Sequence, residues 1–158
     1  MSTVLNQLTL RRGTPADLPA VSEAMADAFD PRFGEAWTSA QCLGMLSLPG
    51  VWLTLGDREG GLVGFALARA IAGDAELLLL AVRPGARGQG IGATLLRSVI
   101  DDARERGADV LHLEVRADNS AARLYNMHGF QKVGARRDYY RGRDGRQYDA
   151  HSFSLKLS

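Results

Sequence analysis

The amino-acid sequence predicts one α+β domain over residues 1–158, with a mixed, mostly antiparallel sheet. Three observations carry this prediction. Strand-like runs joined by tight turns fill residues 51–82 and describe an antiparallel meander. A single amphipathic helix then separates two strands, which allows one parallel crossover. A final hairpin closes the chain, and no linker, repeat or low-complexity run divides it.

The N-terminal part is interpreted as a strand followed by two helices. LTLRRG, residues 8–13, alternates as a short strand does. Thr14 is a good N-cap and Pro15 suits the first helical position, so a helix should follow. Its apolar face comprises Leu18, Val21, Met25 and Ala28. Residues 30–46 indicate a loop and a shorter helix that ends near Pro49.

Between Val51 and Val82 the hydrophobic period becomes that of strands. VWLTL, LVGFALARA and AELLLLAV are the three predicted strands. The turns between them are predicted at residues 56–61 and 72–74, where glycine and aspartate gather.

After Pro84 the period becomes helical again. Apolar residues at helical spacing run from Ile91 to Ala103, and Gly107 is a natural C′ cap. DVLHLEVR, residues 109–116, is the next predicted strand. Asn119 or Asp118 should cap a short helix that runs through Met127. Residues 130–140 and 146–157 form the predicted final hairpin.

Composition excludes several classes of protein. The net charge of +1 gives no support for a nucleic-acid partner. The stretch MSTVLNQLTLRRG lacks the features of a secretory signal, and no apolar run reaches the ~20 residues of a membrane span. The single cysteine, Cys42, excludes an internal disulfide framework and is expected to be a small core residue. We therefore expect a cytoplasmic protein without a membrane partner.

The charge is divided unevenly along the chain. Residues 1–80 carry five Lys and Arg against nine Asp and Glu, whereas residues 81–158 carry fourteen against nine. The basic half opens with the glycine-rich stretch VRPGARGQGIGATLL, residues 82–96. An anionic ligand would find its counter-charge there, although a solvated basic face explains the charge equally well.

The glycines of this stretch fit an anion-binding loop. Backbone N–H groups from Gly88 to Ala93 would converge at a helix N-terminus, where a pyrophosphate is stabilised. A Walker A loop is excluded because Gly92 is followed by Ala-Thr rather than Lys-Ser/Thr. Gly88-x-Gly90-x-x-Ala93 also fits a relaxed Rossmann fingerprint, but the hairpin-connected strands before it do not. A plain strand-to-helix turn is the remaining alternative.

Arg87-x-x-Gly90-x-Gly92, after Ala-Val-Arg-Pro, resembles the acyl-CoA loop of the GNAT N-acetyltransferases. LEVRADNSAARLYNMHGF and RRDYYRGRDGR resemble most closely the branch that acetylates ribosomal-protein alanine. The N-terminal third resembles that branch only in its strand–helix–helix plan. The resemblance implies the GNAT fold, with helices on both faces of the sheet. It also implies that the sheet splays between the strand ending at Val82 and the strand beginning near Asp109.

The resemblance implies acetyl-CoA as cosubstrate and no metal. The residues that would contact it are Leu80, Ala81, Val82, Arg87, Gly88, Gln89, Gly90, Ile91, Gly92, Ala93 and Asn119. The spacing from Asn119 to Tyr125 is one residue shorter than in the family, so either Asn119 or Asp118 would reach the coenzyme arm. His112, His128 and His151 have no metal-ligand spacing and are interpreted as structural or surface residues.

The resemblance also assigns the catalytic residues. Glu114 would be the general base, acting through water, and Tyr125 the general acid that protonates the thiolate. The alternative for Glu114 is a carboxylate that lies on a solvated strand face or pairs with Arg116. The alternative for Tyr125 is a core aromatic residue. Tyr139, Tyr140 and Phe33 would line the acceptor groove. Neighbouring residues on a strand point to opposite faces, so at most one of the two tyrosines is expected there.

The acceptor that this resemblance implies is a protein N-terminal amine, in that branch the alanine of a ribosomal protein. An α-amino group titrates near pH 8 and lysine near 10.4, so a modest base suffices for the N-terminus. The alternatives are acetylation of a small-molecule amine and a non-catalytic acyl-CoA-binding module. The sequence does not indicate the oligomeric state.

Overall fold

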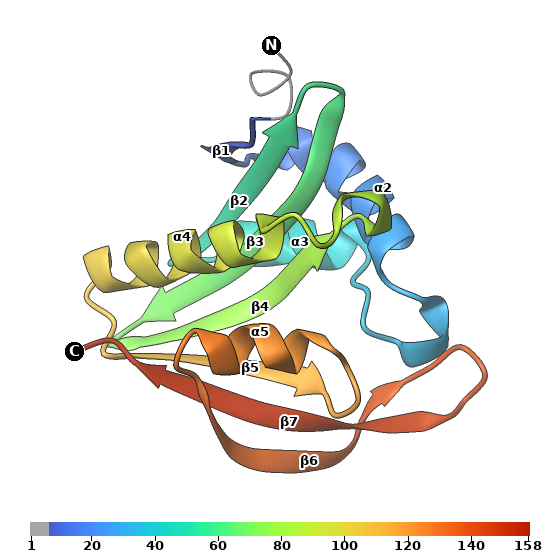
Figure 1. Cartoon of the computed structure of the whole chain (residues 1–158), viewed down its shortest axis with the longest axis vertical. Coiled ribbons are helices and arrows are strands. Elements are labelled where there is room, and N and C mark those ends of the chain that lie inside the picture. The colour runs from blue at the N-terminus through green and yellow to red at the C-terminus, as the bar shows by residue number, and fades with distance from the viewer. Residues whose placement is uncertain (1–6) are drawn as a thin grey trace.

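The computed structural model describes residues 7–158 (Figure 1). Residues 1–6, which form part of the stretch examined for a secretory signal, lie outside this range. The strands are β1 (Thr9–Arg12), β2 (Val51–Arg58), β3 (Gly61–Ile71), β4 (Asp74–Val82), β5 (Val110–Arg116), β6 (Gln131–Arg141) and β7 (Gln147–Lys156). The α-helices are α2 (Leu18–Ala28), α3 (Ser39–Leu46), α4 (Ile91–Glu105) and α5 (Ala121–Met127). Short 3-10 turns cover Pro15–Asp17, Pro31–Phe33 and Pro84–Ala86.

The strands form one seven-stranded sheet in the order β1-β2-β3-β4-β5-β7-β6. Only β4 and β5 are parallel, because α4 is the crossover between them. Their pairing begins at Asp74 with Val110 and ends at Leu77 with Leu113, although both strands continue further. The predicted splay is therefore confirmed, and Figure 1 shows the two strands diverging beyond that point.

A β-bulge at Leu78 reorients the second half of β4. Leu67 pairs with Leu79 and Ala68 with Leu77, so Leu78 has no partner in β3. Leu77 consequently joins the hydrophobic cluster beneath α4 and α5, whereas Leu79 joins the cluster beneath α2 and α3. This bulge could not be predicted from the run of four leucines, because every position in the run is apolar.

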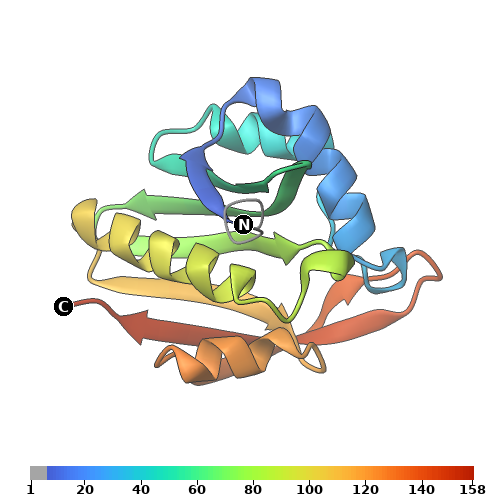
Figure 2. The same cartoon turned by 45° about the horizontal axis from the view of Figure 1, so that its top comes forward.

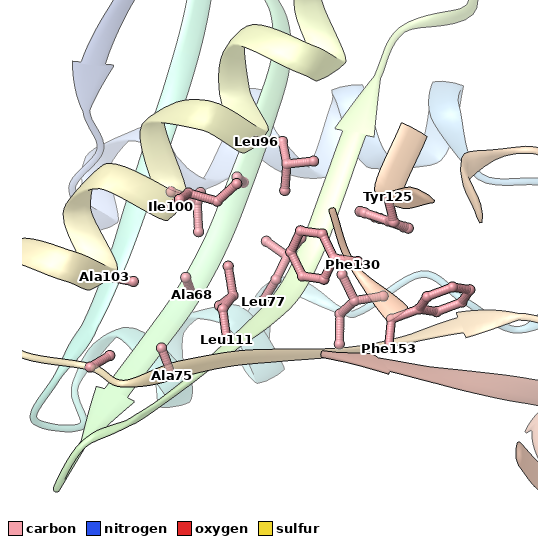
Figure 3. Packing of buried hydrophobic residues seen from close by; sticks show 14 of the residues in the cluster. Ala68, Ala75, Leu77, Leu96, Ile100, Ala103, Leu111, Tyr125, Phe130 and Phe153 are labelled. Carbon is pink, nitrogen blue, oxygen red and sulfur yellow. The ribbon is translucent and has the colours of Figure 1, made fainter. Parts of the chain in front are cut away.

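The predicted helices on both faces of the sheet are present. In Figure 3, Leu96, Ile100 and Ala103 of α4 lie above Leu77 and Leu111 of the central strands. On the opposite face α2 packs Val21 and Met25 against β3 and β4, and Cys42 of α3 lies in that same core, as predicted. Figure 2 shows α4 crossing the sheet.

Two boundaries differ from the prediction. The segment after Thr14 begins with a 3-10 turn, and the α-helix starts only at Leu18. The turn expected over residues 56–61 is much shorter, because β2 and β3 keep pairing out to Arg58 and Gly61 across a bulge. Backbone pairing here overrides the turn preference of glycine and aspartate.

Candidate active site

The loop between β4 and α4 leaves its backbone open to a ligand. Gly88 and Gly90 have φ angles of +76° and +80°, a left-handed conformation that favours glycine. A Cβ atom built on either residue would meet no other atom within 4 Å. The glycines are therefore required by the backbone conformation and keep side chains away from this surface.

The backbone N–H groups of residues 88–93 are free to bind a ligand. Arg87 N–H donates to the Pro84 carbonyl and Thr94 N–H to the Gly90 carbonyl. Among the hydrogen bonds of residues 7–158, none is donated by a backbone N–H between residues 88 and 93. Free N–H groups at a helix N-terminus attract an anion, so the predicted diphosphate site fits the structure.

These residues border a cavity of about 610 Å³, the loop-side cavity. Its walls include Leu80, Ala81, Val82, Arg87, Gly88, Gly90, Ile91, Gly92, Ala93 and Asn119. Gln89 is absent from the wall and hydrogen-bonds to Arg58 instead. The edge of β4 that faces β5 has no strand partner beyond Leu77, so its backbone is available along this cavity.

Arg87 fixes the backbone around the cavity. Its Nε donates to the Val82 carbonyl at 3.1 Å and its Nη2 to the Ala28 carbonyl at 2.7 Å. These bonds join the ends of β4 and α2. The Arg87 guanidinium group therefore hydrogen-bonds to backbone carbonyls and holds the wall of the cavity together.

The splay between β4 and β5 continues into a second cavity of about 130 Å³, the central cleft. Glu114, Tyr125, Tyr139 and Tyr140 all line it. The two cavities share five lining residues, namely Phe29, Glu35, Leu80, Asn119 and Ala121. The loop-side cavity and the central cleft therefore meet at this junction.

Glu114 lies on β5 with its side chain 15 % exposed. Its Oε2 accepts a hydrogen bond from Ser152 Oγ at 2.6 Å, and its Oε1 lies 3.0 Å from Arg136 Nε. Glu114 thus pairs with Arg136, and not with Arg116 as one alternative supposed. Glu114 also lines an open groove of about 610 Å³, which shares Glu76 and Leu113 with the cleft.

Tyr125 is buried, at 6 % exposure, yet belongs to the wall of the central cleft. Its ring packs edge-on against Phe130 at a centroid distance of 5.7 Å and near Phe153 at 6.2 Å (Figure 3). Burial, and next the charge of Glu35, raises the pKa of Tyr125 well above its ordinary value of 10. The phenol therefore keeps its proton at neutral pH, as a general acid must.

Tyr139 and Tyr140 of β6 both line the central cleft, so the expectation that their side chains lie on opposite sides, with at most one in the site, is wrong. Arg136 pairs with Ala150 and Tyr140 with Tyr148, and this places three residues of β6 opposite one residue of β7. Asp138 within this bulge has a φ of +54°, and its N–H donates to Asp149 Oδ1. The bulge breaks the alternation of side chains. The two rings meet edge-on at 4.9 Å.

Phe33 lies in the wall of the loop-side cavity, not in that of the central cleft. Its ring packs edge-on against Tyr148, and Arg116 Cζ lies 3.6 Å from the ring centroid. The structure thus separates Phe33 from Tyr139 and Tyr140, with which it was predicted to form the acceptor groove.

Asn119 and Asp118 occupy different positions. Asn119 lines both cavities, whereas Asp118 lines only the loop-side cavity and pairs with Arg116. Glu35, which sequence analysis did not select, lies beside Asn119 at the junction of the cavities. A lone glutamate in a loop gives no sequence signal, because its partners come from distant segments.

Within residues 7–158, no group of three or more His, Cys, Asp or Glu side chains is arranged to hold a metal ion. His112 lies 3.6 Å from Asp74 at the surface. No helix in the described range is long and apolar enough to cross a membrane.

The chain is similar to known proteins in both sequence and fold. Residues 18–130 match the model of the acetyltransferase (GNAT) family. The chain is 40 % identical over 102 residues to the [ribosomal protein bS18]-alanine N-acetyltransferase of Escherichia coli, covering 64 % of this chain and 68 % of that protein. It is 47 % identical over 93 residues to the N-alpha-acetyltransferase RimI of Mycobacterium tuberculosis, covering 55 % and 57 %.

Structural similarity extends further along the chain than these sequence matches. The crystal structure of the Escherichia coli ribosomal-protein-S18-alanine N-acetyltransferase superposes with a TM-score of 0.84 at 31 % identity. The superposition covers 96 % of this chain and 95 % of the other. It therefore includes the N-terminal region and the final hairpin, which lie outside the family match.

Proposed function

The chain belongs to the acetyltransferase (GNAT) family, and from that premise we propose that it acetylates the N-terminal α-amine of a protein. By analogy with its relatives, the first acceptor to test is the N-terminal alanine of ribosomal protein bS18. The observation that carries the proposal is the junction of the two cavities, which joins the free N–H groups of the loop to Glu114 and Tyr125.

The residues present fit acetyl-CoA as the cosubstrate. The N–H groups of residues 88–93 would hold its diphosphate, and the free edge of β4 at Leu80–Val82 would accompany its arm toward the central cleft. When bound, acetyl-CoA supplies the acetyl group as an activated thioester. The cleft is bordered by Glu114 and Tyr125, so both side chains lie where that thioester would be delivered.

Glu114 would accept the proton of the attacking amine, directly or through water. Ser152 and Arg136 fix both of its carboxylate oxygens, which orients the group between the cleft and the open groove. Tyr125 would donate its proton to the departing sulfur. Burial raises the pKa of Tyr125, so the phenol carries the proton that the sulfur would receive.

The open groove supports a peptide acceptor. It shares Glu76, Leu113 and Glu114 with the central cleft, so a chain lying in the groove can place its terminus at the base. A small cationic amine is the second candidate, because Glu35, Glu76 and Glu114 all border the cleft. Carboxylates in a small cavity favour such a ligand electrostatically.

The test is a screen of acetyl-CoA turnover against peptides with a free N-terminal alanine, the same peptides with a blocked N-terminus, and polyamines. Mass spectrometry locates the added acetyl group. We expect acetylation at the free α-amine and none on internal lysines. Faster acetylation of a polyamine than of any peptide would contradict the proposal and favour the second candidate.

The residue roles are tested with Glu114→Gln and Tyr125→Phe. Each change should lower kcat by about a hundredfold, the usual contribution of general acid or base catalysis. Glu105→Gln, an exposed carboxylate on α4, is the matched control and should behave as the unmodified protein. If both variants keep the full rate, Glu114 and Tyr125 do not have these roles.

A further inference from the structure

Glu35 is a partly buried carboxylate in the segment between α2 and α3, with its side chain 9 % exposed. It is one of the five residues that line both the loop-side cavity and the central cleft. Three of the others, Phe29, Leu80 and Ala121, are apolar. Glu35 and Asn119 are therefore the polar pair of the junction.

The contacts of Glu35 fix the orientation of the Asn119 amide. Asn119 Nδ2 donates to Glu35 Oε2 at 3.1 Å, and Asn119 Oδ1 accepts from the Ala121 N–H at 2.9 Å. A carboxylate only accepts hydrogen bonds, so the amide nitrogen must face Glu35 and the oxygen must face α5. Glu35 thus holds Asn119 in the orientation that satisfies the first N–H of α5.

This contact reaches the predicted general acid. Ala121 is the first residue of α5, and Tyr125 follows four residues later, on the same face of the helix. A shift of the α5 N-terminus would therefore move the Tyr125 ring within the wall of the central cleft. Small displacements of a reacting group reduce rates strongly.

Glu35 also forms an ion pair with a residue of β5. Its Oε1 lies 3.4 Å from Arg116 Nε, and Arg116 also stacks on Phe33. The neighbouring Gly34 packs so closely on β6 that a Cβ there would lie 1.9 Å from the Arg141 carbonyl. Figure 2 shows this segment beside the tip of the β6–β7 hairpin. Contacts from β5, from the loop between β5 and α5, and from the hairpin therefore converge on the loop that carries Glu35.

We propose that Glu35 is a positioning residue for acetyl transfer, which orients Asn119 and through it the α5 N-terminus and Tyr125. The inference rests on the proposed function. The charge of Glu35 also acts on the cleft directly, because it contributes to the raised pKa of both Tyr125 and Tyr140.

The test compares Glu35→Ala, Glu35→Gln, Asn119→Ala and the double variant Glu35→Ala/Asn119→Ala. Glu35→Ala should lower kcat by about tenfold or more, since it removes the acceptor that orients Asn119. Glu35→Gln should recover most of this loss, because an amide oxygen accepts the same hydrogen bond. The double variant should be no slower than Asn119→Ala, because two residues that act in series are not additive.

Glu23→Ala is the matched control, since Glu23 is an exposed carboxylate of α2 outside both cavities. It should leave kcat unchanged. Independent losses that multiply in the double variant, or a Glu35→Ala variant as fast as the unmodified protein, would overturn the inference.

A second measurement does not depend on turnover. Hydrogen exchange of the Ala121 amide, followed without ligand, should accelerate in Glu35→Ala and stay slow in Glu35→Gln. Unchanged exchange in Glu35→Ala overturns the positioning role whatever the activity of the protein. If exchange responds as expected but the unmodified protein acetylates no N-terminus, the proposed function alone fails.

Discussion

Tyr125 is part of the hydrophobic core and also lines the central cleft. Burial keeps the phenol protonated, and the same burial links it to stability. A tyrosine in the unfolded chain titrates near pH 10, whereas Tyr125 in the folded protein titrates higher. Its contribution to stability is therefore complete below pH 10 and decreases as the pH rises above 10.

The expected result is a difference between the unmodified protein and Tyr125→Phe. Above pH 10 the free energy of unfolding of the unmodified protein should fall by about 1.4 kcal/mol more per pH unit than that of the variant. Urea unfolding at pH 9 and pH 11 measures this. The pKa of Tyr140 is also raised, but Tyr140 is present in both proteins, so its contribution cancels in the difference between them. Equal decreases in the two proteins would show that Tyr125 is not held protonated by the fold.

At the scale of elements, the loop between β4 and α4 and the first turn of α4 form the proposed binding site for acetyl-CoA. Gly92 lies in this first turn and lines the loop-side cavity. A Cβ there would meet Leu124 at 3.5 Å and Val82 at 3.7 Å, which are ordinary contacts with two other wall residues. The position therefore accepts a methyl group structurally but places it in the space proposed for the coenzyme.

Gly92→Ala should consequently separate stability from binding. The free energy of unfolding should rise by up to about 1 kcal/mol, because alanine favours a helix over glycine. The dissociation constant for acetyl-CoA should rise by about tenfold, because the methyl group overpacks the site. Denaturant titration and calorimetry measure the two effects.

Gly85→Ala is the control for this pair of measurements. A Cβ at Gly85 meets nothing within 4 Å, and the residue does not line the loop-side cavity. Its affinity for acetyl-CoA should equal that of the unmodified protein. Unchanged affinity in Gly92→Ala as well would place the coenzyme elsewhere.

Elements with a regular period were predictable from the sequence, and irregular ones were not. The helix from Ile91 and the strand at 109–116 follow from spacing alone, and the structure places them within one or two residues of the prediction. The bulges at Leu78 and around Asp138 have no such signal. Each arises from pairing with a neighbouring strand, and the second one brings both Tyr139 and Tyr140 to the cleft.

At the scale of the whole molecule, the sheet topology creates the site. A single helical crossover makes β4 and β5 parallel, and their separation after Leu77 lets the two cavities meet. The helical crossover could be predicted from the sequence. The position of Glu35 in the site could not, because it depends on a contact between the loop after α2 and the β6–β7 hairpin, more than a hundred residues away. Contacts of that range leave no local pattern.

The central claim is that free backbone N–H groups of residues 88–93 bind the diphosphate of acetyl-CoA, at the entrance to the cleft that holds Glu114 and Tyr125. Amide chemical shifts recorded by NMR during titration with coenzyme A test it most directly. The account predicts that the largest shifts fall on residues 88–93, followed by Leu80–Val82. Shifts concentrated on another surface, or none at saturating coenzyme A, would contradict it.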